Sequence, residues 1–250
     1  MIKTYLFKNS HSVGIAAAQK LSEAIKAFTP TLNKPYLVLG LPTGSTPLPM
    51  YRELVRLHKE EGLSFKNVVT FNMDEYCDLP ITHRESYHAF MFENLFKHID
   101  IIPENIHILN GLSEDKEIEC ARYESLINAC GGIDIQVGGI GSNGHIAFNE
   151  PGTAFDSKTH QVTLADQTRR DNARFFGGDI NQVPKSALTI GLGTIMKARE
   201  VMILATGAGK AVAVAKSVQG IRSSTVPASV LQGHANAYFY LDEAAAAELK

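Results

Sequence analysis

Alternation of two hydrophobic patterns along the chain constrains the fold more than any other feature. Short apolar runs are typical of strands, and the segments between them have helical periodicity. The runs lie at 36–40, 67–72, 133–141, 201–206 and 237–241. Most of them are almost continuously apolar, as expected for strands that are buried on both faces. The sequence therefore predicts an α/β fold in which helices cover both faces of a mostly parallel sheet.

The expected helices lie at 11–28, 47–61, 84–98, 114–130, 166–176 and 208–219. No internal repeat or linker divides the chain, so we expect a single domain over residues 1–250. The segment from about 151 to 186 is the most irregular, with glycines and prolines around one short helix. It is either a lid over a site or an ordinary surface excursion.

Charge and cysteine content exclude several classes of protein. The net charge of −2 and the scattered basic residues argue against a nucleic-acid or membrane surface. Cys77, Cys120 and Cys130 are odd in number and lack C-x-x-C spacing, which disfavours a disulfide scaffold and a zinc site. The N-terminus has no signal-peptide pattern, and no apolar run could span a membrane. We therefore expect a cytoplasmic protein.

Four polar clusters each follow an expected strand. They are LPTGSTP (41–47), MDEY (73–76), SNGHIAFNE (142–150) and TGAGK (206–210). The carboxyl ends of parallel strands meet at one edge of a sheet, where α/β proteins bind their ligands. The four clusters therefore predict one common site.

The first and last clusters favour an anion. Ser45 or Thr46 suits the N-cap of the helix that Pro47 opens, and such a helix N-terminus binds phosphate. Lys210 lies in a first helical turn, where a cation is unfavourable unless a counter-anion is present. Arg174 is a second candidate cation. The alternatives are an ordinary capped junction and solvated surface cations, and neither cluster is a P-loop.

The second cluster holds the adjacent acids Asp74 and Glu75. A carboxylate at a strand end serves as a general base, caps the next turn or pairs with a surface arginine.

The third cluster belongs to GGIGSNGHIAFNEPG, which contains the G-x-G-x-x-G spacing of a dinucleotide loop. In such a loop the last glycine opens a helix, but Asn149 and Pro151 would stop a helix within about two turns. We therefore expect a tight turn that presents His145 and Glu150 as a proton shuttle. The alternative is a buried histidine whose hydrogen bonds are satisfied.

These parts suit one class of reaction. A phosphate anchor, a carboxylate base and a histidine–acid pair can open a sugar phosphate and then enolise it. No metal or cofactor is required.

Several ordered motifs resemble the glucosamine-6-phosphate deaminase (isomerase) family over nearly the whole chain. They are LGLPTGSTPLPMY, VTFNMDEY, SYHAFM, GGIGSNGHIAFNEPG, ARFF, NQVPKSALTIGLGTIMKAREVMIL and GKAVAV. The resemblance implies a Rossmann-like three-layer fold without a dinucleotide. It also implies conversion of glucosamine 6-phosphate and water to fructose 6-phosphate and ammonia, in the breakdown of amino sugars.

The resemblance also implies roles for the site residues. Asp74 is the base that moves the C2 proton, and His145, assisted by Glu150, moves the proton of ring opening. Asn143 stands where many relatives have Asp, so Glu150 alone would supply the charge that orients His145. The phosphate-binding positions are Thr43, Gly44, Ser45, Thr46, Arg174 and Lys210.

One departure from the family concerns regulation. Hexameric, allosteric relatives carry basic residues in the strand after the NEP motif and have a longer C-terminal segment. Here that strand has His160 and Val162, and the sequence ends at Lys250. The expectation is an unregulated monomer or low-order homo-oligomer.

Two other functions compete with this interpretation. A 6-phosphogluconolactonase resembles the chain in its phosphate loop, but lactone hydrolysis needs no C2 base, and this chain keeps Asp74 and Glu150. A sugar-phosphate-sensing domain of a transcriptional regulator would follow a helix-turn-helix segment. Here the expected first strand begins at residue 2.

Overall fold

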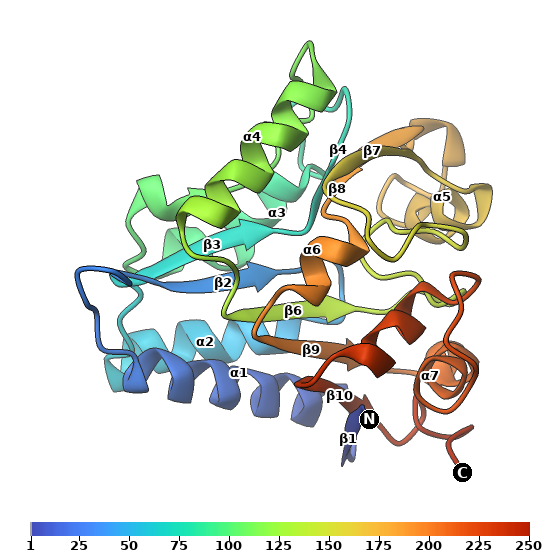
Figure 1. Ribbon diagram of the computed structural model, residues 1–250, viewed down its shortest axis with the longest axis horizontal. Helices are drawn as coiled ribbons and strands as arrows, with labels where there is room; N and C mark the ends of the chain where they lie inside the picture. Colours follow the sequence, from blue (N-terminus) through green and yellow to red (C-terminus); the bar gives the residue numbers. More distant parts are fainter. Residues whose placement is uncertain (1) are drawn as a thin grey trace.

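A central sheet of seven strands organises the protein, whose computed structural model describes residues 2–250 (Figure 1). Its strand order is β1-β10-β9-β6-β2-β3-β5, and every neighbouring pair is parallel. The strands are β1 (Lys3–Phe7), β2 (Leu37–Leu41), β3 (Val68–Asn72), β5 (Ile106–His107), β6 (Ile135–Gly139), β9 (Glu200–Ala205) and β10 (Ala237–Asp242). The predicted parallel sheet is confirmed.

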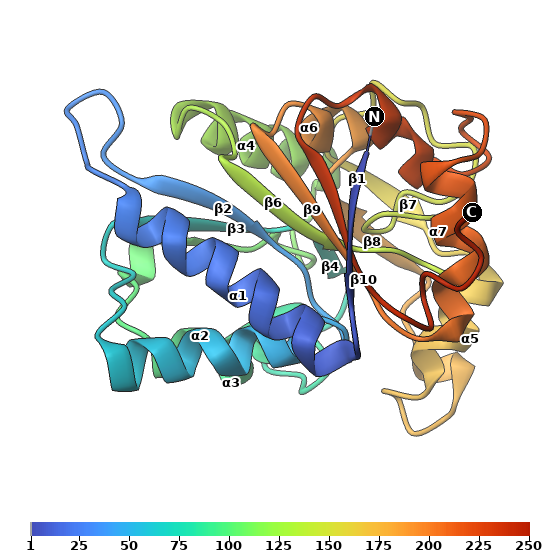
Figure 2. The ribbon, with the colours of Figure 1, turned by 90° about the horizontal axis from the view of Figure 1, so that it is seen from below.

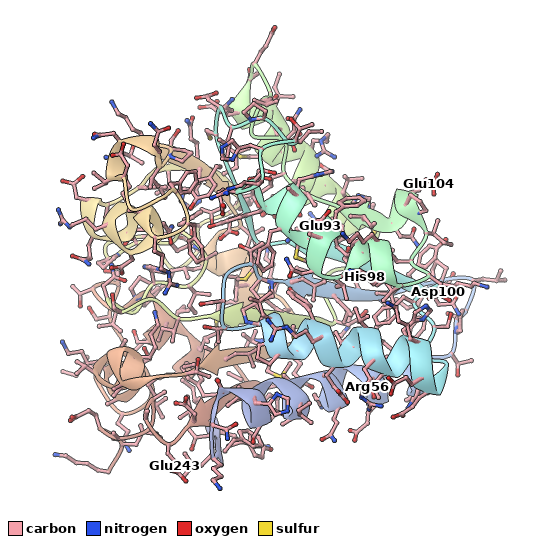
Figure 3. All side chains as sticks on the ribbon, turned by 180° about the vertical axis from the view of Figure 1, so that it is seen from behind. Arg56, Glu93, His98, Asp100, Glu104 and Glu243 are labelled. Atoms are coloured by element: carbon pink, nitrogen blue, oxygen red, sulfur yellow. The ribbon has the colours of Figure 1, made fainter. Side chains whose placement is uncertain are left out.

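Helices cover both faces of this sheet (Figure 2). One face carries α1 (Ser10–Ala27), α2 (Leu48–Glu61) and α3 (Tyr87–Asn94), and the other carries α4 (Lys116–Ala129), α6 (Leu192–Met196) and α7 (Ala211–Val218). Leu37 and Leu39 pack toward the first layer and Val38 toward the second, as the period of a strand requires. Seen from behind, Arg56 on α2 and Glu93 on α3 lie on the outside of the first layer (Figure 3).

Three predicted helices are shorter than expected. The segment 84–98 divides into α3 and a 3₁₀ turn over Phe96–His98, because Leu95 leaves the helical conformation at φ −141° and ψ −64°. The segment 166–176 contains α5 (Asp166–Ala173), and 208–219 begins with a 3₁₀ turn before α7. Among residues 2–250, no helix combines the length and the apolar character needed to cross a membrane.

The segment 151–186 is more ordered than its sequence suggests. It contains β7 (His160–Thr163) and α5, and β7 joins a second, antiparallel sheet with β8 (Ser186–Thr189) and β4 (Asp74–Tyr76). A small apolar cluster that includes Tyr76, Phe148 and Phe176 supports this region. In Figure 1 it lies beyond the carboxyl ends of the central strands.

The loops after β2 and β6 lie where the strand order reverses. From β2 the sheet continues through β3 to β5, whereas from β6 it continues through β9 and β10 to β1. In open α/β sheets, ligands bind in the crevice that such a reversal creates.

Candidate active site

A cavity of about 630 Å³ lies at this edge of the sheet. All four polar clusters contribute to its wall, which confirms that they converge on one site. The predicted site residues that line it are Thr43, Gly44, Ser45, Thr46, Asp74, His145, Arg174 and Lys210. Two more, Asn143 and Glu150, are not part of the wall and contact each other and His145 behind it.

The loop after β2 leaves its polar groups free for a ligand. We expected Ser45 or Thr46 to cap α2, but this is wrong: Pro47 occupies the N-cap position, and no side chain caps the helix. Ser45 is exposed, and its hydroxyl oxygen lies 3.4 Å from Arg174 Nη2. The hydroxyls and the first N–H groups of α2 are therefore available to an anion.

Two cations share the anion-binding end of the cavity. Lys210 is the N-cap residue of α7, and burial lowers its pKa, as does the positive charge of Arg174. The carboxylate of Asp171 on α5 opposes this shift and supplies part of the expected counter-charge. Sequence reasoning missed Asp171, because nothing in its spacing indicates that α5 lies beside Lys210. An anion with two charges, such as phosphate, would compensate both cations.

Asp74 and Glu75 divide the two functions that their sequence position suggested. Asp74 is 7% exposed and lines the cavity, and no hydrogen bond to its carboxyl group comes from the described residues. Burial, with the negative charge of Glu75, raises the pKa of Asp74 to about 8. Glu75 instead accepts the backbone N–H groups of Tyr87 and His88 at the start of α3. Asp74 is therefore the candidate base, and Glu75 caps a helix.

The loop after β6 is a tight turn, as predicted. A Cβ atom on Gly141 would lie only 2.2 Å from Cε1 of His145, and Gly144 has φ +88°. Asn143 Oδ1 accepts the backbone N–H of His145 at 3.1 Å. No helix follows within 140–159. The glycines therefore allow the His145 ring to fold back over the strand end, and the chain lacks the helix that a dinucleotide loop requires.

Behind His145 the carboxylate of Glu150 is held on both oxygens. Oε2 accepts from Asn143 Nδ2 at 2.9 Å and lies 3.7 Å from His145 Nδ1. Oε1 accepts the hydroxyl of Thr168 on α5. Burial alone would raise the pKa of Glu150, but His145, Thr168 and Asn143 together lower it to about 2. Glu150 is therefore an anion beside a histidine that faces the cavity.

Thr168 is the second residue that the sequence did not reveal. It lies 18 positions after Glu150, and only the packing of α5 brings the two together. Cys77, close in sequence to Asp74, is 3% exposed and packs in the apolar core.

Comparison with known proteins places this site in a family context. Residues 8–239 match the model of the family "Glucosamine-6-phosphate isomerases/6-phosphogluconolactonase". The glucosamine-6-phosphate deaminase of Porphyromonas gingivalis is 55% identical over 234 residues, which cover 94% of this chain and 89% of that protein. The deaminase of Drosophila pseudoobscura pseudoobscura is 50% identical over 249 residues, covering 100% of this chain and 90% of the relative.

Solved structures agree with these sequences. A monomeric glucosamine-6-phosphate deaminase superposes with a TM-score of 0.93 at 44% identity, covering 99% of this chain and 100% of its own. The 6-phosphogluconolactonase of Trypanosoma brucei shares the fold, with a TM-score of 0.77 at 21% identity, covering 100% of this chain and 99% of its own.

Proposed function

This chain belongs to the family of glucosamine-6-phosphate isomerases and 6-phosphogluconolactonases, and from that premise we propose that it is a glucosamine-6-phosphate deaminase. The reaction converts D-glucosamine 6-phosphate and water to D-fructose 6-phosphate and ammonia, a step in amino-sugar breakdown. One observation carries the proposal: an unpaired buried carboxyl, a histidine–carboxylate pair and an anion site line or adjoin a single cavity.

The substrate phosphate binds at the loop after β2. The Thr43, Ser45 and Thr46 hydroxyls and the N–H groups at Gly44 and the start of α2 surround it. Arg174 and Lys210 supply positive charge at the same end of the cavity. This anchor fixes C6 of the sugar and so orients C1 and C2 toward the catalytic groups.

Ring opening uses His145. Its ring accepts the proton of the O1 hydroxyl and returns a proton to O5 as the C1–O5 bond breaks, which leaves an aldehyde at C1. The anionic Glu150 stabilises the positive charge that the ring carries between these two steps. Asn143 holds Glu150 and the backbone of His145 at the same time, which keeps the pair in register.

Isomerisation uses Asp74. The C2 proton becomes acidic once C1 is an aldehyde, and Asp74 removes it and delivers a proton to C1. The C1 oxygen takes up a proton and the C2 amine gives one up, so that C1 becomes a CH2OH group and the carbon–nitrogen bond at C2 becomes an imine. Water hydrolyses this imine to the ketone of fructose 6-phosphate with release of ammonia. The pKa of about 8 makes Asp74 a stronger base than an ordinary carboxylate.

No step of this scheme needs a metal or a cofactor. We place the enzyme in the cytoplasm, where thiols stay reduced, since Cys77, Cys120 and Cys130 are all unpaired. We also propose a monomer or a low-order homo-oligomer, in keeping with the monomeric deaminase that the chain resembles at 44% identity.

Ammonia release from glucosamine 6-phosphate tests the proposal, with galactosamine 6-phosphate and 6-phosphogluconolactone assayed in parallel. We expect fast release from glucosamine 6-phosphate and no lactone hydrolysis. Hydrolysis of the lactone without ammonia release from either amino sugar would instead support the lactonase function, which needs no base at C2. Binding of the sugar phosphates without turnover would support a sensing domain.

A further inference from the structure

The hydroxyl of Thr168 joins two parts of the site that belong to different segments of the chain. One part is the turn after β6 with His145 and Glu150, and the other is α5, whose residues form the opposite wall of the cavity. Thr168 is 3% exposed and does line the cavity, but its hydroxyl donates to Glu150 Oε1. That hydroxyl therefore acts on a carboxylate behind the cavity wall.

The two oxygens of Glu150 are held from different elements. Oε2 is held by Asn143, which belongs to the same turn as His145. Oε1 is held by Thr168 alone among the described side chains. Asn143 in the turn after β6 therefore holds one carboxylate oxygen. Thr168 on α5 holds the other and so prevents the carboxylate from rotating.

The same helix extends to the anion-binding end of the cavity. Arg174, the C-cap residue of α5, lies six residues after Thr168, and its Nη2 is 3.4 Å from Ser45 Oγ of the loop after β2. Asn172, between them, donates to the Tyr76 hydroxyl at 3.0 Å. One short helix thus contacts the anion site at its end and Glu150 in its first turn.

From this arrangement we propose that Thr168 is a positioning residue that links binding of the substrate phosphate to the orientation of Glu150 toward His145. A phosphate bound between Ser45 and Arg174 holds the end of α5 in place, and the Thr168 hydroxyl then keeps the Glu150 carboxylate turned toward His145 Nδ1. The inference rests on the proposed deaminase reaction. It adds a reason why ring opening would be efficient only when the substrate phosphate is bound.

Substitution of Thr168 separates the hydroxyl from the shape of the side chain. Thr168→Val removes the hydroxyl and keeps the volume, and Thr168→Ser keeps the hydroxyl. Thr153→Val is a matched control, because the Thr153 hydroxyl donates to the backbone carbonyl of Glu150 at 2.7 Å and leaves its carboxylate alone. All four proteins, wild type included, are first compared by thermal melting.

The proposal predicts a selective loss of turnover in Thr168→Val. We expect kcat to fall about 10- to 30-fold, as for loss of one hydrogen bond to a charged group, with KM changed less than about twofold. Binding of the acyclic 2-amino-2-deoxyglucitol 6-phosphate, which requires no ring opening, should stay at the wild-type value. Thr168→Ser and Thr153→Val should keep kcat within about threefold of wild type.

A spectroscopic measurement completes the test and does not depend on turnover. The Thr168 hydrogen bond lowers the pKa of Glu150, so carbon-13 NMR titration should show a higher Glu150 pKa in Thr168→Val and the wild-type value in Thr168→Ser. An unchanged kcat and an unchanged Glu150 pKa in a folded Thr168→Val would overturn the inference. If the wild type itself released no ammonia, the proposed function would fail, while the Glu150 titration would still decide whether Thr168 holds the carboxylate.

Discussion

The cavity has two walls of different construction. One wall is the carboxyl edge of the parallel sheet, where β2, β3 and β6 end. These three strands are buried almost throughout. The other wall is α5, which β7 and β8 adjoin and a small apolar cluster supports. The first wall carries His145 and Asp74, which follows the end of β3 and begins β4, and the second carries Arg174 and Thr168. We infer that the two walls have different roles. The sheet edge performs proton transfer, and α5 binds the phosphate and positions Glu150.

Asp74→Asn tests the role of the sheet edge in proton transfer and should have the largest effect. An amide cannot remove the C2 proton, so we expect kcat to fall by about 10³-fold or more. Ammonia release measured over a range of enzyme concentrations gives the residual rate. Activity within tenfold of wild type would place the base elsewhere.

The same substitution should stabilise the fold. The folded-state pKa of Asp74, about 8, is above the value of about 3.9 for an unfolded chain. The folded state therefore holds a proton that the unfolded state releases, and stability falls as pH rises from about 4 to 8. Asp74→Asn removes this loss, so its melting temperature should exceed that of wild type at pH 8.5 and approach it near pH 4. A melting temperature below wild type at pH 8.5 would contradict the assigned pKa.

Replacement of His145 tests the other proton transfer at the sheet edge. His145→Gln keeps a polar side chain of similar size but has no titratable group, and we expect kcat to fall about 10²- to 10³-fold. The acyclic amino-alditol phosphate should still bind normally, because the anion site is intact. Loss of that binding would mean that the turn after β6 supports recognition as well as chemistry.

The pH dependence of kcat/KM in the wild-type enzyme should follow the ionisation of Asp74. In the free enzyme Asp74 must lose its proton before it can act, so kcat/KM should rise about tenfold per pH unit up to about pH 8, after correction for titration of the substrate amine. A plateau that begins near pH 4 would show that burial does not raise this pKa.

Arg174→Ala tests the α5 wall. Arg174 is exposed and far from C1 and C2 in the proposed pose, so its loss should raise KM about 10- to 100-fold and lower kcat less. Lys210→Ala, at the N-cap of α7, is the matched comparison and should behave similarly. A pure kcat effect of Arg174→Ala would give α5 a direct part in the chemistry.

The smallest effect concerns the dynamics of the two walls. We expect amide hydrogen exchange to be faster in α5 and β7 than in β2 and β6, because the latter are central strands buried on both faces. Inorganic phosphate should slow exchange in α5 by a few fold and leave the central strands unchanged. Equal protection of both walls would remove the basis of the comparison.

The sequence predicted the sheet wall far better than the α5 wall. The apolar runs that became β2, β6 and β9 predict buried strands directly, and the polar residues after them predict the site at the sheet edge. β4 and β8 escaped this reasoning because each is short, and their pairing depends on contacts distant in sequence.

One local prediction failed and one contact was missed, each for a physical reason. Ser45 and Thr46 do not cap α2, although capping rules favour them, and this exception falls where a ligand would take their place. The hydrogen bond between Thr168 and Glu150 depends on how α5 packs against the turn after β6, which no local pattern encodes. Asp74, Asn143 and His145 were found because their motifs are local.

The central claim is that Asp74 carries the C2 proton, and glucosamine 6-phosphate labelled with deuterium at C2 tests it most directly. The account predicts a primary isotope effect on ammonia release, loss of deuterium from C2, and partial transfer of the label to C1 of fructose 6-phosphate, all abolished in Asp74→Asn. Ammonia release that is insensitive to deuterium and persists at the wild-type rate in Asp74→Asn would contradict it.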